Sequence, residues 1–181
     1  MASVNYQLAA ALVDPNVSFA FSETPTVYSS LIFKTVVVSQ ADCETAWLIS
    51  EKLKQIATLT AAAQNAAISG FKSDALVPGN IRGYTSDLQS QIVIIGALSY
   101  LNPANGISVP PSYTIPSSNL SDGSITFNAY TYSQFYKLFT DMAEFSASIY
   151  TQLSTKISEI NSINTGNVNN DLDSVYAITW D

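Results

Sequence analysis

One apolar stripe constrains the fold of this chain more than any other feature of its sequence. Between residues 133 and 163, large apolar side chains recur at steps of three and four, the spacing of one helix face. The stripe consists of Phe135, Leu138, Phe139, Met142, Phe145, Ile149, Leu153, Ile157, Ile160 and Ile163. A helix of roughly 30 residues is about 45 Å long, more than a domain of this size needs for its own core. Part of it is therefore expected to extend into an assembly.

Two further helices are predicted upstream of this stripe. The first covers residues 41–69, begins near Ser39 and Asp42, which can cap it, and ends at Gly70. The second covers residues 87–101 and stops before Pro103. Its apolar residues with helical spacing are Leu88, Ile92, Ile95, Leu98 and Leu101.

The first 38 residues predict β-structure instead. Residues 17–21 alternate between apolar and small or polar side chains, residues 22–26 have turn chemistry, and residues 28–39 are rich in β-branched side chains. We expect a strand–turn–strand unit whose apolar face is covered either by helix 41–69 or by another chain. Residues 71–85 and 102–121 are expected to be loops, and Asp122-Gly123 predicts a second, small β-hairpin.

These patterns predict an α+β protein that is mostly helical. Its expected parts are an N-terminal β arm at residues 1–38, which would attach the protein to a neighbour, and a helical domain with an inserted hairpin at residues 39–181. The arm is the expected attachment segment because two short strands are marginal alone and leave edges that invite pairing.

The charges exclude several classes of partner. The chain has 181 residues, of which 47% are hydrophobic and 12% charged, and its net charge is −7. Arg82 is the single arginine, and the lysines are scattered, so no basic stripe exists to bind nucleic acid. The longest apolar run, residues 92–98, is far shorter than the roughly 20 residues of a membrane-spanning helix. We expect neither nucleic-acid binding nor membrane insertion.

The residue types also argue against catalysis. The sequence contains no histidine, which excludes Ser-His-Asp and Cys-His pairs and most transition-metal sites. The single cysteine, Cys43, is expected to pack rather than react. The acidic pairs Asp171/Asp173 and Asp141/Glu144 are expected to face solvent, and the oxygen-rich residues 164–173 to form caps and turns rather than a calcium loop. We expect no enzyme, no cofactor and no metal site.

Several strings resemble a small domain of unassigned function found in the tail proteins of tailed bacteriophages. They are Ile68-Ser69-Gly70-Phe71-Lys72-Ser73-Asp74-Ala75-Leu76, Tyr84-Thr85-Ser86-Asp87-Leu88-Gln89-Ser90-Gln91, Ile95-Gly96-Ala97, the hairpin, the long last helix and Ala177-Ile178-Thr179-Trp180. The resemblance covers residues 50–181, approximately, and the strings occur in the same order. It supplies no catalytic residues.

The resemblance implies a non-enzymatic structural component of a phage virion, in the tail fibre, the baseplate or an adaptor. Such a protein would be assembled in the host cytoplasm and would bind other tail proteins and copies of itself. An assembly chaperone and a carbohydrate-binding module remain alternatives, the latter because tyrosines with small polar neighbours can bind sugar rings. The residues expected at a partner interface are Phe19, Phe21, Tyr28, Leu31, Phe33, Tyr132, Tyr136 and Tyr150.

Overall fold

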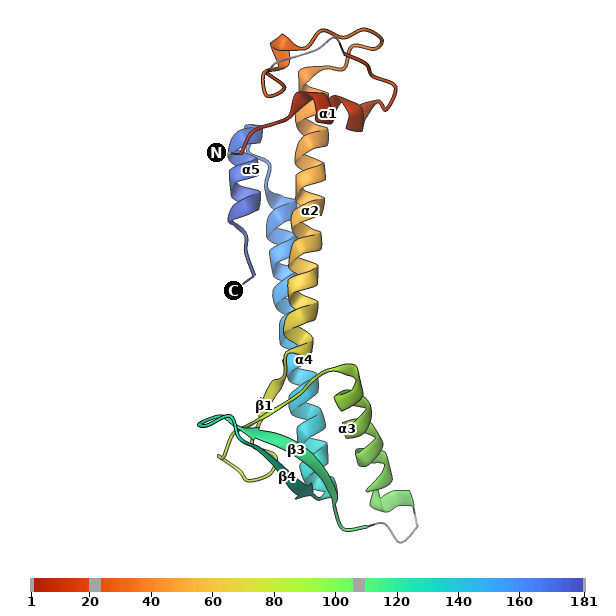
Figure 1. Cartoon of the computed structure of the whole chain (residues 1–181), viewed down its shortest axis with the longest axis vertical. Helices are drawn as coiled ribbons and strands as arrows, with labels where there is room; N and C mark the ends of the chain where they lie inside the picture. Colours follow the sequence, from red (N-terminus) through yellow and green to blue (C-terminus); the bar gives the residue numbers. More distant parts are fainter. Residues whose placement is uncertain (1, 20–23, 106–109, 181) are drawn as a thin grey trace. The chain divides into compact units, whose positions relative to one another are not determined.

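The computed structural model describes residues 2–19, 24–105 and 110–180, which form an α+β fold that is 57% helical (Figure 1). The predicted fold class is therefore confirmed. The α-helices are α1 (Tyr6–Val13), α2 (Gln40–Ile68), α3 (Leu88–Tyr100), α4 (Tyr132–Ser162) and α5 (Val168–Ala177), and the short 3-10 helices are Tyr28–Ser30 and Pro103–Asn105. The strands are β1 (Phe71–Ser73), β2 (Arg82–Tyr84), β3 (Tyr113–Asn119) and β4 (Ile125–Tyr130).

The chain divides into two compact units, which differ from the arm and domain expected from the sequence. We call Met1–Ala61 with Leu153–Asp181 the terminal unit, and Ala62–Gln152 the central unit. Helices α2, α3 and α4 differ by one residue at each end from the helices that the periodicity predicts. The long stripe of α4 serves both units, because Phe135 and Leu138 are buried in the central one and Leu153 and Ile160 in the terminal one.

The predicted N-terminal β unit is not confirmed, and part of it, residues 20–23, lies outside the described residues. Residues 6–13 form α1, whose start is capped by Asn5, because its Oδ1 accepts a hydrogen bond from the Leu8 N–H at 3.2 Å. The alanines of this segment favour the helix once it is capped. Within the described part of residues 1–38, the only β contact is an isolated bridge between Phe19 and Phe33.

The N-terminal segment packs against the helices of its own unit. Val4, Tyr6, Ala9, Ala10, Leu31 and Val38 share a buried cluster with Cys43 of α2 and Leu172 of α5. The Tyr6 hydroxyl donates to Glu44 Oε1 at 2.7 Å, and the Ala2 N–H donates to Asp173 Oδ1 at 2.8 Å. The sequence left two possible covers for the apolar face of this segment, helix 41–69 or another chain. In the structure, helices of the same unit cover it.

In the central unit, one antiparallel sheet has the strand order β1-β2-β3-β4. Strands β1 and β2 correct the expectation of a loop over residues 71–85. The hairpin predicted at Asp122-Gly123 is confirmed, and the φ of +71° at Gly123 explains the glycine there.

Helices α3 and α4 cover one face of this sheet (Figure 1). The core between them is largely aromatic and aliphatic. It contains Phe71, Tyr84, Ile94, Ala97, Leu101, Ile115, Tyr130, Phe135, Leu138 and Met142. The two buried phenols, Tyr84 and Tyr130, satisfy each other through a hydrogen bond of 3.0 Å.

Candidate functional site

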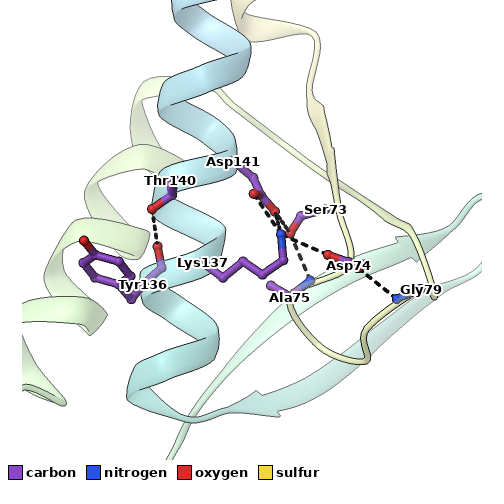
Figure 2. A network of polar contacts seen from close by, with 8 residues as sticks. All are labelled: Ser73, Asp74, Ala75, Gly79, Tyr136, Lys137, Thr140 and Asp141. Atoms are coloured by element: carbon purple, nitrogen blue, oxygen red, sulfur yellow. Dashed lines mark hydrogen bonds and ion pairs between the residues drawn. The ribbon is translucent and has the colours of Figure 1, made fainter.

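The densest charged cluster in the central unit surrounds Lys137 of α4 (Figure 2). Its Nζ lies 2.9 Å from Asp141 Oδ2, one helical turn later, and 3.0 Å from Asp74 Oδ1 in the segment after β1. Asp74 also accepts a hydrogen bond from the Gly79 N–H at 2.8 Å. The cluster therefore ties the connection between β1 and β2 to α4.

Ser73 brings a hydroxyl to the same cluster, which raises the question of a serine–lysine hydrolase. Its Oγ donates to Asp141 and accepts from the Ala75 N–H at 3.0 Å. The Asp141 and Asp74 carboxylates raise the pKa of Lys137, so its ammonium stays charged near neutral pH. A charged lysine cannot accept the serine proton, and the arrangement favours a structural brace over an active site.

The terminal unit contains a buried carboxylate, Glu51, which is only 5% exposed. Burial by itself would raise the pKa of Glu51, but hydrogen bonds from Lys54 and Tyr176 outweigh it and lower that pKa. The Lys54 Nζ lies 2.6 Å from Glu51 Oε1, and the Tyr176 hydroxyl donates to Oε2. A carboxylate held ionised by two donors is a poor general acid, so this pair too favours a structural role.

Helix α3 presents large apolar side chains to solvent. Asp87 caps its start by accepting from the Ser90 N–H at 3.0 Å, and Ile94, Ala97 and Leu101 enter the core. On the opposite side of the helix, Leu88, Ile92 and Ile95 are 71%, 60% and 51% exposed. We call these three residues the α3 outer face.

The α3 outer face contains no charge, because residues 88–101 include no Asp, Glu, Lys or Arg. Single exposed apolar residues are ordinary, whereas several on one uncharged face are typical of a protein interaction site. This face is the candidate functional site of the central unit.

The sheet has a second apolar region on the face away from α3 and α4. There Ile125 and Phe127 of β4 are 69% and 73% exposed. A hollow of about 370 Å³ lies nearby, lined among others by Gly83, Pro116, Leu120 and Ile125. A Cβ on Gly83 would meet the Ser118 Oγ of β3, so a larger residue at this position would force that side chain to turn away.

The structure separates the interface residues predicted from the sequence. Phe19, Tyr28, Leu31 and Phe33 pack inside the terminal unit, with Phe19 and Phe33 rings 5.2 Å apart and Tyr28 and Phe33 rings 6.0 Å apart. Their predicted role at a partner interface is therefore not supported by exposure. Phe21 lies outside the described residues.

The three predicted tyrosines of α4 are also not brought together. Tyr132 is half-buried against the central core, whereas Tyr136 and Tyr150 are exposed. Because the last two are 14 positions apart on one helix, their Cα atoms are about 21 Å apart. They do not form one aromatic platform of the kind that stacks on a sugar ring.

Sequence reasoning did not assign the α3 outer face or the exposed residues of β4 to an interface. The available signal was that apolar residues occur on every side of the segment 88–101, so one side had to remain outside the core. For β4, the signal was the apolar alternation at Ile125 and Phe127 in a hairpin with an open face.

Comparison of the chain with known protein families, with curated proteins and with solved structures found no match. Among the described residues, no group of three or more Cys, Asp or Glu side chains is placed to bind a metal ion. None of the helices in the described ranges combines the length and apolar character that crossing a bilayer requires.

Proposed function

We propose that this chain is a non-enzymatic structural protein of a phage tail that works by binding other proteins. The observation that supports binding most directly is the α3 outer face, where Leu88, Ile92 and Ile95 are each more than half exposed. Covering a large apolar side chain contributes about 1.5–3 kcal/mol at full burial, so three such residues are an appreciable source of affinity.

The chemistry of this face favours a protein partner with an apolar groove. A helix that offers anchors at successive turns docks by inserting them into such a groove. Because residues 88–101 carry no charge, the lining of the partner's groove needs no charged group to pair with them. Other tail proteins and copies of this chain are the partners that we propose.

A non-enzymatic role is supported by the state of the ionisable groups. Lys137 is held charged between two carboxylates, and Glu51 is held ionised by two donors. Neither group is poised to exchange a proton near neutral pH.

The assignment to a phage tail rests on the resemblance of residues 50–181 to the tail-protein domain. Under this proposal the protein is assembled in the host cytoplasm and remains in the virion. An assembly chaperone would share the binding face but leave before the particle is complete.

Quantitative mass spectrometry of purified virions and of the infected-cell lysate tests the proposal. We expect the chain in virions at a fixed ratio to the other tail proteins. Detection of the chain in the lysate but not in virions would indicate an assembly chaperone. If the chain did not come from a phage at all, the tail assignment would be rejected.

A pair of variants tests the binding face in the same assay. Ile92→Lys should lower incorporation into virions, whereas Leu53→Lys, at a comparably exposed apolar residue of α2, should not. Equal incorporation of both variants would show that the α3 outer face is not the binding site.

A further inference from the structure

Strand β4 has a free edge in the described part of the chain. It is last in the strand order, so β3 lies on one side of it and no strand on the other. Its six residues include no charged side chain and no proline, and its one-to-one register with β3 has no bulge. Charges, prolines and bulges are the features with which proteins ordinarily protect an edge strand from pairing, and β4 lacks them.

The hydrogen-bond pattern identifies the groups that this edge offers. The Asn119 N–H donates to the Ser124 carbonyl at 2.8 Å, which makes these two a bonded pair, and bonded pairs recur at every second residue along the hairpin. Thr126 and Asn128 therefore bond to β3. Pro116, which has no N–H, lies opposite Phe127, as expected for a non-bonded position.

The backbone groups of Ile125, Phe127 and Ala129 consequently point away from β3. No backbone hydrogen bond joins these three residues to any part of the described chain beyond the hairpin. The same residues place their side chains on the open face of the sheet, where Ile125 and Phe127 are strongly exposed. Unpaired backbone groups and exposed apolar side chains thus coincide on one strand.

We propose that β4 pairs with β4 of a second copy of this chain, antiparallel, about a two-fold axis at Phe127. This register places Phe127 opposite Phe127 of the second copy, and Ile125 opposite its Ala129. By symmetry, Ala129 then lies opposite Ile125 of the second copy. All three residue pairs use outward-pointing backbone groups, which gives about six hydrogen bonds between the copies.

The occupant is a second copy because the strand is complementary to itself in this register. The two phenylalanines meet across the axis, each isoleucine meets a small alanine, and no like charges oppose each other. The result is a continuous eight-stranded sheet with Ile125 and Phe127 of both copies on one face.

The size of the contact sets its strength. Pairing of two six-residue edges buries on the order of 700 Å² in total, below the range of standard stable interfaces. We therefore expect a weak, reversible dimer. This inference rests on the geometry of β4 alone and holds whether or not the proposed tail function is correct.

Sedimentation velocity of the purified full chain over a concentration series tests the proposal. The wild type should dimerise reversibly, and Phe127→Lys and Phe127→Glu should each weaken self-association at least tenfold, or about 1.4 kcal/mol. Mixing the two variants should restore a dimer, because the register sets residue 127 opposite itself. Leu53→Lys, at an exposed apolar residue of α2, is the control and should dimerise like the wild type.

Three results would overturn the proposal. They are a wild type that stays monomeric at several hundred micromolar, both single variants dimerising with the affinity of the wild type, and failure of the mixture to associate. If either Phe127 variant lacks the wild-type circular dichroism spectrum, Ile125→Lys and the double variant Ile125→Lys/Ala129→Glu replace them. The single variant should be monomeric, and the double variant should form a salt-sensitive dimer, since the lysine introduced in one copy would then face the glutamate introduced in the other.

Discussion

Tyr176 donates a hydrogen bond to Glu51, a residue 125 positions earlier in the chain, and thereby fastens α5 to α2 within the terminal unit. The bond matters energetically because Glu51 is buried and ionised, and an ionised buried group that loses a donor is destabilised. The contact therefore links the last helix of the chain to the stability of its first 61 residues.

We expect Tyr176→Phe to lower the free energy of unfolding by about 1–2 kcal/mol, because Glu51 would keep only the Lys54 donor. Urea denaturation followed by circular dichroism measures the change. Tyr150→Phe removes a hydroxyl from an exposed tyrosine of α4 and serves as the control, with an expected loss of less than about 0.5 kcal/mol. Equal losses in the two variants would contradict the role assigned to the Tyr176–Glu51 bond.

Tyr6 should make the protein sensitive to alkali. Burial, followed by the hydrogen bond to Glu44, raises the pKa of Tyr6 from 10.0 to about 12. Since the folded state holds the proton more tightly than the unfolded state, the contribution to stability is complete below pH 10.0 and disappears as the pH rises through about 12. The contribution is on the order of 2 kcal/mol.

Urea denaturation at a series of pH values above neutrality checks this prediction. The free energy of unfolding of the wild type should fall between pH 10.0 and about 12, and the fall should be smaller in Tyr6→Phe. An identical pH profile for the two proteins would show that Tyr6 is not the responsible group.

Alanine substitutions at two glycines should change the free energy of unfolding in opposite directions. At Gly83 a Cβ would push the Ser118 Oγ away from its hydrogen bond to the Gly83 carbonyl, so Gly83→Ala should lower the free energy of unfolding by about 0.5–1.5 kcal/mol. Adding Ser118→Ala removes that oxygen and should recover part of the loss. At Gly96, in α3, a Cβ would have no atom within 4 Å, so Gly96→Ala should stabilise by about 0.5–1 kcal/mol.

Thermal unfolding of the three variants shows directly whether each is more or less stable than the wild type. A stabilising Gly83→Ala would mean that the Ser118 side chain turns away from residue 83 without cost. A destabilising Gly96→Ala would mean that another surface packs against α3 at this position.

The elements that could be predicted from the sequence are mainly those whose apolar pattern continues over many residues. The ten apolar residues of the α4 stripe leave no alternative to a helix over that length, because a strand would place them on both faces. The hairpin turn was predictable for a different reason, since Asp122-Gly123 is a strong local signal and the chain needs a positive φ at the glycine.

Short elements could not be predicted in the same way. Strands β1 and β2 have three residues each, too few for an alternation to be recognised, and they exist because β2 pairs with β3. Residues 6–13 are helical because Asn5 caps their start and the alanines after it favour a helix, and the alternation at residues 17–21 lies outside this segment.

The residues predicted at a partner interface show what an apolar pattern leaves open. Phe19, Tyr28 and Phe33 are apolar enough to require a cover, but an apolar pattern does not say whether that cover belongs to the same chain. Conversely, α3 has more apolar sides than its core contact can bury, and only the structure shows that Ile94 points inward and Ile92 outward.

The division of the chain into a terminal and a central unit has a consequence for synthesis on the ribosome. Translation supplies all of Ala62–Gln152 before any part of Leu153–Asp181 exists. The central unit can thus fold while the nascent chain is still growing, whereas Val4, Ala9 and their neighbours must wait for Leu172 to complete their cluster. Until Leu172 has been synthesised, the apolar residues near Val4 and Ala9 remain without their final cover, although they were made more than 160 residues earlier.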